Sequence, residues 1–411
     1  MTLKTILATL LLSCTTVFCL SGRKGGIALT VHAGTYDRRN CIVSAEIPAA
    51  GDASCWKLSE QKGKKKTSVP SQTVQRGNKT VLYWILSGQT KANEVRTYIA
   101  RQVKKQPAHN IMQVEDTQQA LLLKKDGKTV LQYNYPHAEP PPGVNAAYRR
   151  SGFLHPVCSP AGNVLTGIQP KDHYHHYGIW NPWTHIVYDG KLYDLWNLGD
   201  KKGTVRAEAI KDSEQGAVFS RFDAALSHVI FTPDGEKVIM DEHWDVTAWN
   251  IPDLFLWDFE SRLRPSTPLP VLIQAYRYAG FGYRATAEWT KDNCEMMTSE
   301  GKTRQEIDGT AARWIYITGD TKTGRSGLLF MGHPENRNAP EPLRIWDEKA
   351  NGGRGDAFIN FAPTKNKDWE LEAGKQYVLR YRVLAYEGQM TSAQANSLWN
   401  DFAHPPIVKI K

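Results

Sequence analysis

Four histidines fall within the twenty-six residues from Lys171 to Trp196, KDHYHHYGIWNPWTHIVYDGKLYDLW. A core segment is expected to avoid so many of them, because each buried imidazole needs its own hydrogen-bond partners. Histidine titrates near neutral pH, so a positioned imidazole can act as a general acid or base. The segment therefore predicts the floor or rim of a site, in which His175 or His176 is the candidate acid.

The cluster Asp172 to His176 is compatible with several kinds of chemistry. In extended backbone His173 and His175 share one face and His176 the other, whereas a turn would bring all three together. Imidazoles can also hold a divalent metal, but neither a HExxH motif nor a second cluster with ligand spacing accompanies them. We expect a substrate-binding or proton-transfer site that needs no cofactor. Metal-dependent chemistry and a merely hydrogen-bonded loop remain the alternatives.

Aromatic residues surround the histidines, among them Tyr174, Trp180 and Trp183. Their flat apolar faces with polar edges suit stacking on the C–H face of a sugar ring, although such rings also fill protein cores. Trp180 is the candidate platform, and the predicted partner is a saccharide or glycan.

Two later segments offer partners for the histidines. In VIMDEHWDVTA (238–248), Glu242 shares a strand face with apolar residues, so it is edge-exposed, paired or functional, and it is the candidate base. In AGFGYR (279–284), the glycines indicate a bulge or a close approach, and Arg284 can reach a substrate oxygen or a carboxylate such as Glu260. Arg284 is therefore predicted to polarise a substrate oxygen.

Further candidates for substrate binding come from loops. GHPENRNAP (332–340) places His333, Asn336 and Arg337 in a proline-bounded polar loop, a type that often lines sites on sheet scaffolds. His155 is the fifth histidine of the predicted site. A hydrogen-bonded surface loop is the alternative for 332–340.

The elements that must position these residues are strands. Short apolar or alternating runs separated by turns such as Pro233-Asp234-Gly235 predict an all-β protein, dominated by a large antiparallel β-sandwich similar to a supersandwich. We expect a small N-terminal β-sandwich over 26–108 and the large sandwich over 118–411. A capping box at Thr391 to Gln394 predicts one helix near the C-terminus.

The N-terminal sequence predicts export. Residues 1–21 combine Lys4, an apolar run and small residues near Ser21, as in a secretory signal peptide, and Cys14 raises the alternative of a lipoprotein anchor. We expect a periplasmic or secreted protein with no transmembrane segment after the signal. Cys41 and Cys55 are close enough for a local disulfide.

The formal charge of +9 comes largely with lysines in the N-terminal third, such as QKGKKK (61–66). Solvated loops explain these lysines better than nucleic acid does, because no nucleic-acid motif accompanies them. We therefore expect no nucleic-acid partner.

Five motifs taken in order resemble an exported bacterial family labelled "methane oxygenase PmoA-like". They are LHPVCSPAG (154–162), DHYHHYGIW (172–180), GFGYR (280–284), ARWIYITG (312–319) and GHPENRNAP (332–340). The family is closer to HPHHRG where this chain has HYHHYG, so Tyr177 stands at an expected arginine. The label cannot be literal, because a membrane methane-oxidising subunit needs spanning helices.

The resemblance implies an exported β-protein typical of polysaccharide-degrading bacteria. Its architecture looks similar to the galactose-mutarotase supersandwich, whose members bind sugars and use histidine with a carboxylate. Together with the motifs it predicts proton transfer on a saccharide by an epimerase, a glycoside hydrolase or a lyase. A non-catalytic glycan-binding module is the main alternative.

Overall fold

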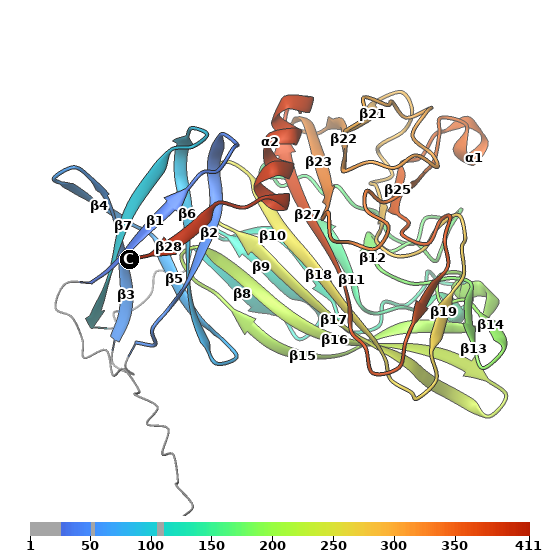
Figure 1. The fold of residues 1–411 in the computed structure, drawn as a ribbon. Coiled ribbons are helices and arrows are strands. Elements are labelled where there is room, and N and C mark those ends of the chain that lie inside the picture. Colours follow the sequence, from blue (N-terminus) through green and yellow to red (C-terminus); the bar gives the residue numbers. More distant parts are fainter. Residues whose placement is uncertain (1–25, 51–53, 105–110) are drawn as a thin grey trace, which may run out of the picture.

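The computed structural model describes residues 26–50, 54–104 and 111–411. The chain folds into antiparallel sheets that form a small unit and a large unit (Figure 1), and the described residues contain two α-helices. The all-β prediction is therefore confirmed. The predicted signal peptide and Cys14 lie outside the described residues.

The small unit is a sandwich of two sheets. The first sheet has the order β28 (Ile407–Ile410), β1 (Ile27–His32), β7 (Val95–Lys104), β3 (Ser54–Lys62) and β4 (Lys65–Val69). The second has the order β2 (Arg38–Ile47), β6 (Lys79–Thr90) and β5 (Ser71–Arg76). Leu29, Val43, Trp84 and Tyr98 are buried between them. Alternating burial along these strands explains why the segment folds as a sandwich.

The end of the chain belongs to this small unit, contrary to the predicted boundaries. β28 pairs with β1, with Val408 opposite Val31. The buried ion pair between Arg38 Nη1 and Asp401 Oδ1, at 2.9 Å, ties the preceding helix to the same unit. The large unit also begins before 118, because residues 112–116 form a strand of it. Strand pairing over such separations leaves no local pattern in the sequence.

The large unit contains two eight-stranded sheets around one core. The longer-stranded sheet has the order β15 (Gly203–Glu214), β16 (Phe219–Thr232), β17 (Gly235–Trp249), β18 (Phe255–Pro265), β27 (Tyr377–Glu387), β23 (Gly324–Gly332), β22 (Trp314–Thr321) and β21 (Cys294–Thr298). The other has the order β24 (Leu343–Ile345), β25 (Phe358–Phe361), β20 (Gly282–Arg284), β12 (Ile179–Trp180), β11 (Phe153–Val157), β10 (Lys128–Asn134), β9 (Leu121–Lys125) and β8 (Met112–Asp116). Apolar side chains of both sheets form the principal core.

Short elements complete the large unit. A four-stranded sheet has the order β14 (Lys191–Tyr193), β13 (Ile186–Tyr188), β19 (Val271–Ile273) and β26 (Trp369–Leu371). The helical segments are η1 (Ala146–Tyr148), η2 (Leu198–Asp200), α1 (Ala350–Gly353) and α2 (Ser392–Ala403). Thr391 and Gln394 form the predicted capping box at the start of α2. α1 lies at the end of the molecule opposite to the small unit (Figure 1). Neither α-helix of the described residues has the length and apolarity that a bilayer span requires.

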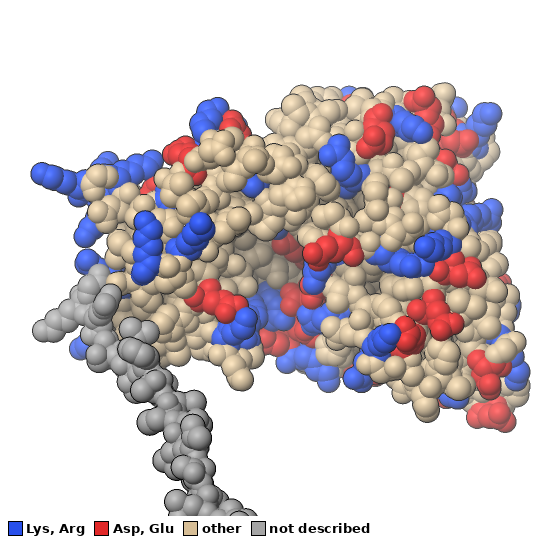
Figure 2. Space-filling model, in the orientation of Figure 1, with Lys and Arg blue, Asp and Glu red and all other residues tan. Residues whose placement is uncertain are grey.

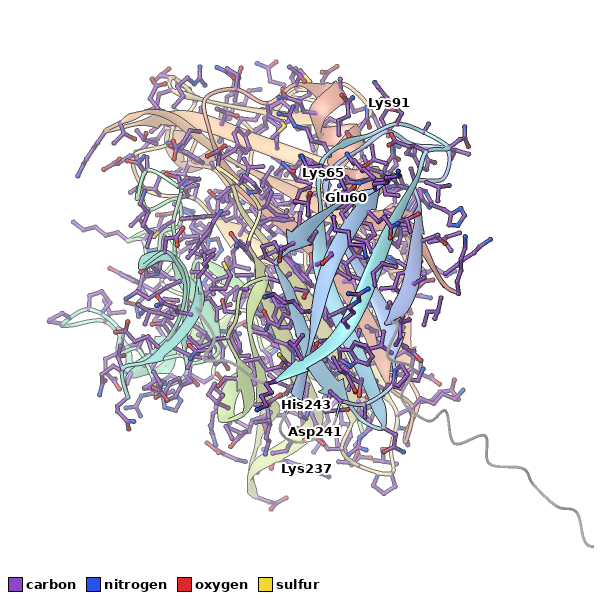
Figure 3. The ribbon with its side chains drawn as sticks, turned by 90° about the vertical axis from the view of Figure 1, so that its left-hand side faces the viewer. Glu60, Lys65, Lys91, Lys237, Asp241 and His243 are labelled. Carbon is purple, nitrogen blue, oxygen red and sulfur yellow. The ribbon has the colours of Figure 1, made fainter. Side chains whose placement is uncertain are left out.

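The long strands β17 and β18 follow the predicted alternation. Phe255, Trp257 and Phe259 of β18 are buried. From Asp258 onward, the residues that alternate with the buried ones are more exposed. Along β17, Asp241 and His243 lie on the outward face and are labelled at the lower end of Figure 3. The sheet therefore has one core face and one polar face.

The polar face carries ion pairs in a hollow beside the small unit. Figure 2 shows basic and acidic side chains gathered in this hollow. Arg221, Asp245 and Asp258 line it; Arg221 pairs with Asp245 at 2.6 Å, and Asp258 pairs with Arg382 at 2.6 Å. Since each arginine has a carboxylate, this hollow is electrostatically balanced.

The four cysteines of the described residues are all unbonded. Cys41 is buried in the core of the small unit, and Cys55 lies on β3. The Cys41–Cys55 disulfide that the sequence left possible is therefore not formed, because closeness in sequence does not set the approach of side chains from strands in different sheets.

Candidate functional site

The histidine segment forms turns, so its rings converge. The N–H of His173 donates to the carbonyl of Pro170 at 2.9 Å, and the N–H of His176 donates to the carbonyl of His173 at 3.0 Å. The ring centroids of His173 and His175 lie 5.4 Å apart, and both lie 4.8 Å from that of His176. Gly178 follows at φ +58°, where a Cβ would collide with the carbonyl of Leu154. The turn alternative of the sequence analysis is confirmed.

Four short neighbouring strands assemble the wall around these rings. β12 leaves the histidine turn and pairs with β20, which pairs with β25, which in turn pairs with β24. Arg284 thereby lies opposite Phe358, and Trp346 follows directly after β24. The ring of His176 stacks on Phe358 at 5.1 Å, and the ring of His173 lies 4.6 Å from Trp346. Residues from three distant parts of the chain therefore meet at one place.

The histidines line a cavity of about 550 Å³. Its wall combines three histidines, aromatic rings and charged side chains from several loops. It is formed by His173, His175, His176, Trp196, Asn197, Arg277, Tyr278, Gln305, Asp308, Arg344, Ile345, Trp346, Asp347, Lys349, Ala350, Asn351 and Phe358. This volume is in the range of small-molecule sites, roughly 300–1,000 Å³, and the mixture of rings and polar groups is typical of them.

Burial keeps two of the histidines unprotonated. Desolvation, together with the neighbouring His173, lowers the pKa of His175 to about 4. Desolvation also lowers the pKa of His176 well below its usual value, with contributions from His175 and Arg284. Both imidazoles are therefore neutral at pH 7 and are weak bases, so they suit hydrogen-bond acceptance rather than proton transfer. A general acid must carry a proton before it reacts, so burial argues against His175 or His176 as the predicted acid.

Asp172 holds the third histidine. Its Oδ2 lies 2.7 Å from His173 Nδ1 and accepts a hydrogen bond from Asn351 Nδ2 at 2.8 Å. The His173 hydrogen bond and the charge of Arg284 lower the pKa of Asp172 despite partial burial. An ionised carboxylate on Nδ1 places the remaining proton chemistry of His173 at Nε2. Asp172 is thus a positioning residue.

Arg284 supports the wall from behind. Its Nη2 lies 3.3 Å from Asp172 Oδ2 and 3.7 Å from Asp356 Oδ1, and its guanidinium stacks 4.8 Å from Trp346. The side chain is only 4% exposed. Arg284 therefore orients Asp172 and Trp346 and does not contact Glu260, which pairs with Arg380 at 2.7 Å instead. Trp180, also fully buried, lies 5.0 Å behind His176, so it is no stacking platform.

Glu242 lies away from the cavity, which contradicts its predicted role as base. It is fully buried between the two large sheets. Its oxygens accept from Asn181 Nδ2 at 2.7 Å and Ser261 Oγ at 2.5 Å, and lie 2.8 Å from His228 Nε2. Of the three options for a carboxylate on an apolar face, pairing is therefore the observed one.

The remaining predicted binding residues also lie elsewhere. His155 Nδ1 bonds Thr166 Oγ1 at 2.8 Å, and burial lowers its pKa to about 4. His333 lines a separate hollow of about 160 Å³ beside α2. Asn336 Nδ2 donates to Glu341 at 2.7 Å, and Arg337 Nη2 donates to the carbonyl of Asp368 at 2.5 Å. The sequence motifs do not reveal that this loop packs against β27 and α2 and takes no part in the histidine cavity.

Sequence reasoning missed much of the wall, above all the segments around Tyr278, Asp308 and Trp346. The run RIWD (344–347), with a tryptophan between charged residues, was the available signal. Tyr177, at the position of the expected arginine, lies outside the wall: its hydroxyl accepts from Gln169 Nε2 at 2.6 Å. Across residues 26–50, 54–104 and 111–411, no group of three or more His, Cys, Asp or Glu is placed to hold a metal ion.

A family model matches residues 120–400, a range that contains the entire cavity wall. The chain belongs to a family of unknown function, DUF6807. No curated protein matches the chain. The methane oxygenase label that the motifs suggested has no support in these matches.

Solved structures resemble this DUF6807 member in fold. An alpha-mannosidase from Enterococcus faecalis V583 is similar over 95% of this chain and 46% of that chain, with a TM-score of 0.50 and 8% identity. A galactose mutarotase related enzyme from Lactobacillus acidophilus is similar over 67% of this chain and 97% of that chain, with a TM-score of 0.34 and 9% identity. The chain thus spans about half the length of the alpha-mannosidase, and the 8% identity to that enzyme speaks for the fold alone.

Proposed function

We propose that the protein binds a saccharide in the histidine cavity and catalyses proton transfer on it. The observation that carries the proposal is the wall itself, in which three histidine rings face the same space as Trp346 and Tyr278. Aromatic faces suit the apolar C–H face of a sugar, and polar edges suit its hydroxyl groups. The N-terminal sequence supports placing this activity in the periplasm or outside the cell.

The three imidazoles have different roles in the proposed chemistry. His173, with Asp172 on its Nδ1, moves a proton at Nε2, while His175 and His176 accept hydrogen bonds from the sugar as neutral rings. No metal ion takes part in this scheme. Epimerisation, glycosidic hydrolysis and elimination all need such a proton transfer, so turnover products are what distinguishes them.

Calorimetric titration with monosaccharides and oligosaccharides, followed by product analysis, tests the proposal. Replacing Trp346 with Ala should weaken binding about tenfold, because a stacked ring contributes roughly 1 kcal/mol or more. His173→Ala should abolish turnover while leaving binding nearly intact. His137→Ala, an exposed histidine outside the cavity, is the matched control and should change neither.

The outcomes separate the alternatives. Binding without turnover of any glycan by the unmodified protein would identify a glycan-binding module. Turnover that a chelator removes and added zinc restores would identify metal-dependent chemistry. Absence of any saccharide binding would refute the proposal.

A further inference from the structure

Two cations contact one carboxylate of the cavity wall, Asp308, and a third cation belongs to a neighbouring residue of the wall. Arg344 Nη1 lies 2.7 Å from Asp308 Oδ2, and Lys365 Nζ lies 3.6 Å from Asp308 Oδ1. Lys365 Nζ also donates to the backbone carbonyl of Arg277 at 3.2 Å, and, in addition to burial, the charge of Arg277 contributes to lowering the pKa of Lys365. One carboxylate neutralises only one of the three charges.

Arg277 is the cation of this group that is free to bind a ligand. It is exposed, lines the cavity and forms no ion pair with any described residue. Its guanidinium lies 5.6 Å from the ring of Tyr276 and 5.4 Å from the ring of Tyr278. Stacking occupies the faces of the planar guanidinium, whereas its N–H donors lie in the plane. The donors therefore remain available at the cavity edge.

The other charged residues of the wall do not neutralise this excess of positive charge. Lys349 and Asp347 also line the cavity, and Asp347 Oδ1 accepts the backbone N–H of Lys349 at 2.9 Å. Three cations of the wall (Arg277, Arg344 and Lys349) face two carboxylates (Asp308 and Asp347), which leaves one net positive charge, and Lys365 beside Asp308 adds another from outside the lining. Burial lowers the pKa of Lys365, and the charges of Arg344 and Arg277 lower it further. A bound anion would relieve this repulsion.

We propose that the cavity selects an acidic saccharide, and that the carboxylate of a uronic acid binds at the edge of the cavity that carries Arg277 and Arg344, with Lys365 adding positive charge behind Asp308. This rests on the proposed function, since it specifies the sugar in the same cavity. Arginine donates two parallel N–H bonds to a carboxylate, which the hydroxymethyl group of a neutral hexose cannot accept in that form. The histidines then contact the ring hydroxyls of the same sugar.

Paired titrations test this specificity on the full protein. The probes are glucuronate, galacturonate and mannuronate, each compared with its parent hexose and its methyl ester. The acid should bind at least tenfold more tightly than either neutral form, and 0.5 M NaCl should reduce the difference. Arg277→Gln should remove about tenfold of the affinity for the acid and leave the affinity for the parent hexose unchanged. Arg264→Gln, an exposed arginine outside the cavity, is the control.

The two proposals fail in different ways. If the hexoses bind as tightly as the uronates, or Arg277→Gln weakens both equally, acid selection is refuted and saccharide binding stands. If a sulfated sugar binds more tightly than every uronate, the anion is a sulfate and the carboxylate assignment is wrong. If neither acids nor hexoses bind, the proposed function itself fails.

Discussion

Substitutions of Glu242 test whether this buried residue stabilises the fold or takes part in catalysis. Its two carboxylate oxygens accept hydrogen bonds from Asn181 at 2.7 Å and Ser261 at 2.5 Å, and one of them lies 2.8 Å from His228 Nε2. The side chain of Glu242 has no exposed area. Glu242→Leu keeps a side chain of similar size but removes every acceptor. Three buried donors then lose their partner, and each such loss costs about 1–3 kcal/mol. We expect the free energy of unfolding to fall by about 3 kcal/mol or more.

Glu242→Gln is the matched variant, because its amide oxygen still accepts from Asn181 and Ser261. Only the contact with His228 is altered, so the loss should be about 1–2 kcal/mol. Urea unfolding monitored by circular dichroism measures both variants against the unmodified protein. In the folded protein, saccharide affinity and turnover should stay within about twofold, because Glu242 lies outside the cavity wall.

Two results would refute this reasoning. The first is a leucine variant that unfolds at the same urea concentration as the unmodified protein. The second is a glutamine variant that is fully stable and binds sugar normally but no longer turns it over, which would make Glu242 catalytic.

Three further predictions follow from named contacts. Asp172→Asn should lower turnover at least tenfold with little change in sugar affinity, because the ionised partner of His173 Nδ1 is lost. Asp234→Asn, in an exposed turn, is the control. Equal effects of the two substitutions on turnover would contradict the prediction. The free energy of unfolding should keep its full value above about pH 6.5 and fall as the pH drops toward 4, because His155 and His175 bind protons more readily in the unfolded chain than in the folded protein. A urea unfolding midpoint that stays constant across this pH range would contradict the prediction. Deletion of residues 405–411 should speed amide exchange in β1 at least tenfold, since β28 is its edge partner, and unchanged exchange in β1 would show that the pairing contributes nothing.

Strand content and local signals were readable from the sequence alone, since they depend on neighbouring residues. Alternation in 254–263 predicted which face of β18 is buried, and the Thr391–Gln394 capping box predicted the start of α2. The density of rings in Lys171 to Trp196 correctly directed attention to His173, His175 and His176. Each of these features depends on side chains that lie within about ten residues of it in the sequence.

Tertiary structure decided which distant residues share the cavity. The pairing of β12, β20, β25 and β24 brings Trp346 and Phe358 to the histidines, whereas the position of Glu242 on the core face of β17 removes it from them. A strand pattern indicates which face is apolar but not which strand lies alongside, because backbone hydrogen bonds between strands do not depend on side-chain identity. Composition therefore identified the histidine turn, and strand order alone supplied the cations and aromatic rings that surround it.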